Sequence, residues 1–117
     1  MQPLGVHHVS INVDDVDAAL AFYVDTLGLT VRDDRPNFPF PGAWLNAGHQ
    51  QVHLIGGTPP KDVGQHFAFA VEDLDAVVQE IRGRGLEVSD PVPVGPGRQA
   101  FLHDPAGNKV ELNQPPS

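Results

Sequence analysis

The chain has 117 residues and a mass of 12.6 kDa, the size of one ordinary domain or of two small modules sharing a core. It has no cysteine, which excludes disulfides, thiolate metal ligands and thiol nucleophiles. Fifteen acidic residues against seven basic ones give a net charge of −8, so nucleic-acid binding is not expected. No apolar run approaches the ~20 residues that span a bilayer, and no secretion signal is visible, so we expect a cytoplasmic protein without membrane contact.

The first predicted elements are a strand over residues 8–13 and a helix that ends at Gly28. In the strand, apolar and polar residues alternate with the period of two that is typical of a half-buried strand. Asp14 or Asp15 can cap the helix, because a carboxylate accepts hydrogen bonds from the first free N–H groups. Its apolar residues recur at helical spacing: Val16, Leu20, Tyr23 and Leu27.

A loop rich in proline and aromatic residues follows, between strand candidates at residues 29–31, 43–45 and 52–55. It contains three prolines and three aromatic residues between positions 35 and 45, so it predicts either a stiff apolar wall beside a binding site or a packed connection that closes the core. Arg35 is a candidate for binding a carboxylate or carbonyl group of the substrate. The candidates for apolar contact with a substrate are Phe38, Phe40 and Trp44.

The second half of the chain repeats the first. Residues 8–18 align with residues 66–76 at an offset of 58 (66 − 8), and residues 51–55 align with 109–113 at the same offset. Between these anchors the register slips by one, because Gly28 matches Gly85. We therefore expect one domain, 1–117, made of two modules over residues 4–57 and 63–114.

The second module predicts the same elements in the same order. A strand begins at His66, a helix with apolar residues Leu74, Val77, Val78 and Ile81 ends at Gly85, and strand candidates follow at residues 87–88, 100–102 and 110–112. Residues 94–99 form the glycine-containing connection of this module, and Arg98 within it is a candidate substrate contact. The predicted fold class is α+β, with two βαβββ modules in tandem forming a cup-shaped sheet. The modules should pack on each other or on a second chain, because neither buries its apolar faces alone.

Four polar side chains occupy repeat-equivalent positions on the strand faces opposite the apolar residues. Three imidazoles and one carboxylate suit Zn, Ni, Mn, Co or Fe(II), and a site that leaves positions open for substrate can act as a Lewis acid. The predicted ligands of this divalent metal ion are His8, His53, His66 and Glu111.

Three stretches together resemble the vicinal oxygen chelate superfamily, which includes glyoxalase I, bleomycin-resistance proteins and extradiol dioxygenases. These are His7–Val13, Ala21–Leu29 and Phe101–Leu112, and the resemblance covers nearly the whole chain. It implies paired βαβββ modules that form a cup around a divalent metal, a small-molecule substrate, and often a homodimer.

Carried over by position, His8, His66 and Glu111 match the metal triad of the superfamily. His53 lies where glyoxalase I usually has a fourth ligand, commonly Glu, that can also act as a base. The resemblance therefore implies that Glu111 or His53 moves the proton. His103 lies where family members often carry Arg.

Three functions follow from these observations. The first is a metal-dependent lyase or isomerase of the glyoxalase type, for which lactoylglutathione lyase is the class name, although the acidic composition does not favour glutathione. The second is an Fe(II) extradiol dioxygenase, which the two-histidine, one-carboxylate set suits but the short chain does not. The third is a non-enzymatic antibiotic-binding resistance protein, whose relatives generally lack the metal ligands.

Overall fold

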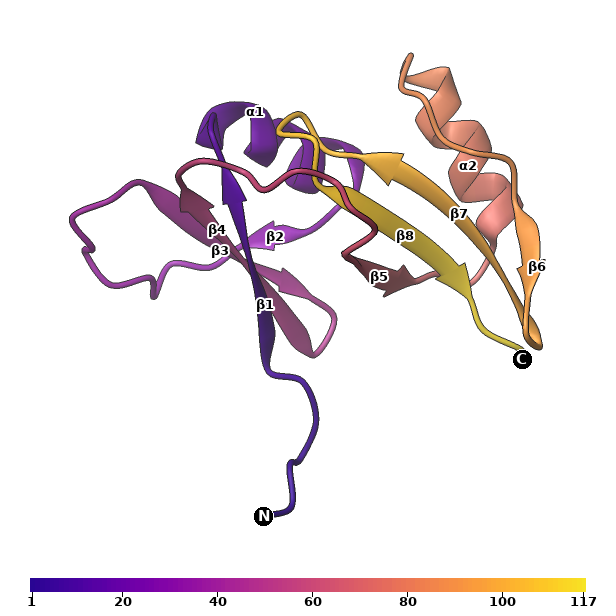
Figure 1. Ribbon diagram of the computed structural model, residues 1–117, viewed down its shortest axis with the longest axis horizontal. Coiled ribbons are helices and arrows are strands. Elements are labelled where there is room, and N and C mark those ends of the chain that lie inside the picture. The colour runs from indigo at the N-terminus through magenta and orange to yellow at the C-terminus, as the bar shows by residue number, and fades with distance from the viewer. The chain divides into compact units, whose positions relative to one another are not determined.

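The computed structural model describes all 117 residues. The chain divides into two compact units, Met1–Lys61 and Asp62–Ser117, each with one four-stranded sheet (Figure 1). The elements of the first unit are β1 (His8–Val13), α1 (Val16–Leu20), the π-helical turn η1 (Ala21–Thr26), β2 (Thr30–Val31), β3 (Gly42–Ala47) and β4 (Gln50–Gly56). Those of the second are β5 (His66–Ala70), α2 (Leu74–Gly83), β6 (Val92–Val94), β7 (Gly97–His103) and β8 (Lys109–Gln114).

Both sheets have the same strand order, β1-β4-β3-β2 in the first unit and β5-β8-β7-β6 in the second. The first strand of each unit pairs in parallel with the last strand, and all other pairs are antiparallel. The α+β class and the βαβββ order predicted from the repeat are confirmed. Neither helix is long and apolar enough to cross a membrane.

One face of each sheet forms the core with its helix. In the first unit the fully buried side chains include Val13, Tyr23, Leu45 and Leu54, and in the second they include Leu74, Ile81, Val110 and Leu112. Because side chains alternate across a strand, the polar residues between these apolar ones lie on the opposite face of the sheet. This alternation places the predicted ligands away from the core.

The two helices start alike but differ in length by one residue. Asp15 accepts a hydrogen bond from the N–H of Ala18, and Asp73 accepts the equivalent bond from Ala76. The helical segments then end at Gly28 and Gly85, both with φ +82° in the left-handed region that favours glycine.

The additional residue of the first helix lies in the π-helical turn, where the N–H of Leu27 bonds to the carbonyl of Phe22 five residues before it. A π turn holds one residue more than an α turn, which explains the one-residue slip of the repeat. It also rotates the helix face. The buried residues are Ala19, Phe22 and Tyr23. Of the predicted stripe, Tyr23 is thus buried as expected, whereas Val16, Leu20 and Leu27 are only half-buried.

The strand predicted at residues 87–88 is wrong, because that segment forms no ladder with β7. In the first unit the repeat-equivalent residues Thr30 and Val31 pair with β3 as β2. The backbone hydrogen bond that follows this pairing is present in both units. In the second unit the N–H of Ser89 donates to the carbonyl of Phe101, as the N–H of Arg32 donates to the carbonyl of Trp44 in the first. The strand pairing forms instead at β6, which makes a tight hairpin with β7. The turn of this hairpin and the start of β7 lie inside the segment predicted as a connection, residues 94–99.

An ion pair fastens α2 to β7. Both Nη atoms of Arg98 donate to the carboxylate oxygens of Asp75 at 3.0 Å. This bond, together with the positive charge of Arg98, lowers the pKa of Asp75 below its ordinary value of 3.8 although burial opposes the shift. A carboxylate with a lowered folded-state pKa stabilises the fold above its unfolded-state pKa, and the effect is lost as the pH falls through the folded-state value.

We therefore expect Asp75→Asn to lower the melting temperature at neutral pH and to have little effect at a pH well below 3.8, where the wild-type carboxyl is also protonated. The control is Asp17→Asn, because Asp17 occupies the same place in the first turn of α1 and forms no ion pair. Equal effects of the two substitutions at neutral pH would contradict a role for Arg98. Thermal unfolding followed by circular dichroism measures both.

Candidate functional site

The face of the first sheet that is turned away from the core carries two predicted ligands in contact. The parallel register pairs His8 with Gln51 and Ser10 with His53, so His8 and His53 are diagonal neighbours on adjacent strands. Their rings stack, with centroids 4.0 Å apart and an angle of 15° between the planes. Trp44 of β3 stacks on the ring of His53 at 4.3 Å and 9°.

His53 is therefore held between two flat rings, with only 8% of its surface exposed. Its Nε2 lies 2.8 Å from Oε1 of Gln51, an acceptor, so Nε2 carries a proton and Nδ1 offers a lone pair. Burial lowers the pKa of His53 below its ordinary 6.5, and nearby His8 and Arg32 lower it further. The ring is thus kept neutral near pH 7, with one nitrogen available to accept a proton or to bind a metal.

The predicted aromatic wall lies next to this stack. Phe38 and Phe40 stack on each other at 5.1 Å, and Phe38 lies 6.2 Å from Trp44. Each of the two phenylalanines keeps 38% of its surface exposed, so the wall is open on one side. The guanidinium of Arg35 lies over both rings, and its Nη2 donates to the carbonyl of Phe40, so this side chain braces the loop.

The second sheet holds the other two predicted ligands in direct contact. His66 is paired with Lys109 and Ala68 with Glu111, so His66 and Glu111 have the same diagonal relation as the pair in the first unit. Nε2 of His66 lies 3.0 Å from Oε1 of Glu111, whose carboxylate is almost wholly buried. Nδ1 of His66 donates to the carbonyl of Gly64 at 2.9 Å, and Nδ2 of Asn113 donates to Oε2 of Glu111 at 2.8 Å.

Several residues of these faces were not predicted. Phe101 packs edge-on against His66 at 5.3 Å, and Nζ of Lys109 lies 4.6 Å over the Phe101 ring. Phe101 is the repeat equivalent of Trp44, so the offset of the repeat applied to Trp44 would have found it. Gln51 and Asn113 gave no signal in the sequence, because a polar residue two places from a ligand on a strand is common.

Arg98, predicted to contact the substrate, lies on the other face of β7. Its side chain alternates with that of Gln99 and shares the core-facing side with buried Ala100 and Leu102. Glu111 pairs with Phe101 on the opposite face. Because Asp75 also engages both terminal nitrogens of its guanidinium, we leave Arg98 out of the candidate site.

The four predicted ligands thus form two pairs, one in each unit, and no group of three His, Asp or Glu side chains is gathered to hold a metal ion. The pair in the second unit fits a metal well. A histidine ligand usually donates its other ring N–H to a carbonyl or carboxylate, as His66 does, and Asn113 holds the carboxylate of Glu111 in place.

The pair in the first unit fits less directly. An imidazole nitrogen binds a metal in the plane of its ring, so the parallel rings of His8 and His53 do not direct their lone pairs at one point. Either ring can serve as a ligand where it stands, and both can do so only if one leaves the stack.

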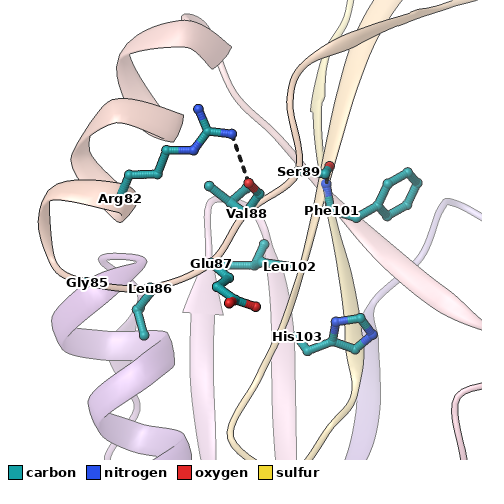
Figure 2. Close-up of a pocket in the computed structure, with 9 residues that line it drawn as sticks. All are labelled: Arg82, Gly85, Leu86, Glu87, Val88, Ser89, Phe101, Leu102 and His103. Carbon is teal, nitrogen blue, oxygen red and sulfur yellow. Dashed lines mark hydrogen bonds between the residues drawn. The ribbon is translucent and has the colours of Figure 1, made fainter.

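A cavity of about 950 Å³ lies at the edge of β7 where the predicted strand at residues 87–88 is missing. Figure 2 shows Arg82 and Leu86 on one side of this cavity, with the side chains of Phe101 and His103 pointing away from them. Two of the polar side chains here are engaged: Arg82 donates to the carbonyl of Val88 and to Asp90, and Ser89 accepts from the N–H of Phe101. None of the predicted ligands lines this cavity.

Comparison with known proteins agrees with this geometry. Residues 5–112 match the Glyoxalase/Bleomycin resistance protein/Dioxygenase superfamily, and the chain belongs to that superfamily. The resemblance that the sequence motifs indicated is confirmed.

The curated relatives include proteins named as lyases. The chain is 34% identical over 121 residues to a Synechocystis protein named as a probable lactoylglutathione lyase, covering 92% of each chain. It is 33% identical over 119 residues to a probable chloroplastic lactoylglutathione lyase of Arabidopsis thaliana, and it spans only 34% of that longer protein.

Solved structures of the same fold include proteins of two kinds. A protein assigned to the glyoxalase family from Bacillus anthracis has a TM-score of 0.88 and 26% identity, with 98% of each chain covered. TnmS3, an antibiotic binding protein from Streptomyces sp. CB03234, has a TM-score of 0.84 and 29% identity, again with 98% of each chain covered. Membership of the superfamily therefore leaves both catalysis and binding to be argued from the site.

Trp44 is the only tryptophan and stacks on His53, so its fluorescence should report the protonation of that histidine. A protonated imidazole quenches a stacked indole more strongly than a neutral one. We expect the emission to fall with decreasing pH around a midpoint below 6.5, because burial favours the neutral ring.

In His53→Gln the transition should disappear, whereas the exposed turn histidine provides a control, His49→Gln, that should leave the midpoint unchanged. A midpoint at or above 6.5, or a transition that persists in His53→Gln, would contradict the assignment.

Proposed function

We propose that the protein is a divalent-metal-dependent lyase or isomerase of the glyoxalase type, acting on a small molecule that presents two oxygens. The observation that carries this proposal is the His66–Glu111 contact, in which a buried carboxylate and an imidazole oriented by the Gly64 carbonyl face each other at 3.0 Å. The lyase names of relatives at 33–34% identity support the reaction class.

The proposed metal ligands are His8, His66 and Glu111, with His53 as either a fourth ligand or a base. This donor set suits Zn, Ni, Mn, Co or Fe(II). When bound, such an ion supplies a Lewis acid that polarises a carbonyl oxygen of the substrate.

Of the two roles open to His53, we propose that of the base. Its ring is neutral, buried and fixed between Trp44 and His8, with the lone pair of Nδ1 unused and the proton of Nε2 directed to Gln51. A general base needs a lone pair at a fixed position and a pKa near or below the working pH. Glu111, held by His66 and Asn113, is better placed as a ligand than as a mobile base.

The substrate is proposed to lie against the exposed faces of Phe38 and Phe40 with Trp44 beside them. These rings favour an apolar or planar group next to the two chelating oxygens. The guanidinium of Arg35 already donates a hydrogen bond within the loop and lies over the ring of Phe38. It therefore contributes a positive charge next to the wall, and it is not a free group for binding an anion. The net charge of −8 and the engaged arginines do not favour glutathione over a smaller thiol or another carbonyl substrate.

Substitutions can distinguish the proposed metal ligands from the proposed base. We expect His66→Ala and Glu111→Ala to lose stoichiometric metal and activity, and His53→Gln to keep its metal while turnover falls by about 10²- to 10⁴-fold. Elemental mass spectrometry of protein purified without added metal or chelator measures occupancy, and turnover is assayed with 2-oxoaldehyde hemithioacetals of several thiols.

Matched controls are His49→Ala and Glu72→Ala, which remove the same side-chain types from exposed positions. Full metal occupancy in His66→Ala or Glu111→Ala would overturn the ligand assignment, and loss of the metal in His53→Gln would make His53 a ligand. Oxygen-labile iron in the wild-type protein would favour the extradiol dioxygenase instead.

A second candidate function, non-enzymatic binding of a planar compound, is favoured by the open aromatic wall and by the similarity to TnmS3. For this function we expect the metal-free protein to bind an uncharged planar compound such as 2-naphthol, because Arg35 gives the wall a local positive charge. Trp44→Leu should weaken binding about tenfold through the lost stacking, whereas His66→Ala should leave it unchanged. Isothermal titration calorimetry measures both, and undiminished binding in Trp44→Leu would count against this function.

The homodimer and the cytoplasmic location also stay predictions. Size-exclusion chromatography with light scattering tests the homodimer, and cell fractionation tests the location.

A further inference from the structure

A chain of hydrogen bonds leads from His103, at the end of β7, to His66, at the start of β5. Nε2 of His103 donates to Oδ2 of Asp62 at 2.8 Å. The second oxygen of Asp62 accepts the N–H of Gly64 at 2.9 Å, and the carbonyl of Gly64 accepts Nδ1–H of His66 at 2.9 Å.

The turn in the middle of this chain of hydrogen bonds, residues 62–65, lies at the surface. Val63 is 85% exposed, so no apolar burial fixes the segment. Gly64 has φ +109°, a conformation that side chains rarely adopt. The N–H of Val63 donates to the side chain of Gln65, which adds a further hydrogen bond within the turn. The hydrogen bond from the N–H of Gly64 to Asp62 therefore helps to set the direction of the Gly64 carbonyl.

The electrostatics favour a charged Asp62. The hydrogen bond from His103 lowers its pKa below the ordinary 3.8, the N–H of Gly64 lowers it further, and Lys109 adds a smaller effect in the same direction. An ionised carboxylate accepts both hydrogen bonds at once, and charge-assisted bonds of this kind are about twice as strong as neutral ones.

We propose that Asp62 and His103 are positioning residues for His66. They fix the Gly64 carbonyl, which accepts a hydrogen bond from Nδ1–H of His66 and so turns Nε2 of the ring toward Glu111. The inference rests on the proposed function only in taking Nε2 as a metal-binding atom. Such partners of a ligand typically change metal affinity by 10- to 100-fold.

The first unit has no equivalent device, which gives an internal control. The repeat equivalent of His66 is His8, whose Nδ1 lies 2.9 Å from Nδ1 of the neighbouring His7. The repeat equivalent of His103 is Asn46, which bonds to Arg32. Changes at Asp62 or His103 should therefore alter His66 and leave His8 as it is.

The experiment uses the full-length, metal-free protein with ¹⁵N-labelled histidine. Long-range ¹H–¹⁵N spectra at neutral pH report which ring nitrogen carries a proton, and titration with Zn²⁺ against a chromophoric chelator reports affinity. The variants are Asp62→Ala, His103→Ala, His103→Gln, which retains an N–H donor, and the control His49→Ala.

We expect Asp62→Ala and His103→Ala to lose the protected Nδ1–H signal of His66 and to bind Zn²⁺ about 10- to 100-fold more weakly. His103→Gln should restore both properties, and the His8 signal should not change. An unaltered His66 signal in both alanine variants would overturn the proposal, whatever the Zn²⁺ affinity. If the wild-type protein binds no Zn²⁺ but the His66 signal responds as expected, the positioning role stands and the proposed metal enzyme does not.

Discussion

The parallel pairing of the first and last strands of each unit fixes the rest of this structure. It sets His8 diagonal to His53 and His66 diagonal to Glu111, although some 45 residues separate the members of each pair along the chain. A slip of one residue in either pairing would turn an entire strand over and move its polar residues into the core. The slip would also expose the buried apolar residues of the other sheet face, such as Leu54 in one sheet and Leu112 in the other. The lost burial makes the slipped register unfavourable.

The two units hold their pairs of polar residues in different ways. In the first, flat rings stack on both sides of His53, lower its pKa by burial and leave it as a fixed, neutral imidazole. In the second, hydrogen bonds take the place of stacking, and His66 and Glu111 are each held by a second partner. Stacking suits a group that must receive a proton, whereas directed hydrogen bonds suit groups that must hold a metal ion.

Much of this could be predicted from the sequence, because strand alternation, the aspartate caps and the repeat are local patterns with one structural solution. The face of Arg98 was also readable, since it shares parity with apolar Ala100 and Leu102. The π turn and the missing pairing at residues 87–88 could not be predicted, because each depends on how the helix or the loop packs on the sheet of its own unit. The hydrogen bonds of Gln51, Asn113 and Asp62 depend on side-chain geometry that no spacing encodes.

The strand pairing also has a consequence for the order in which the chain folds. Residues that pair between strands β1 and β4 are 43 positions apart in the sequence (51 − 8), and those that pair between β5 and β8 are separated by the same interval (109 − 66). The β3–β4 and β7–β8 hairpins are local and can form early, whereas the parallel pairs require the closure of a long loop, which slows folding. Each pair of predicted ligands is therefore among the last parts of its unit to assemble, and on the ribosome the pair of the first unit cannot form until about half of the chain has emerged.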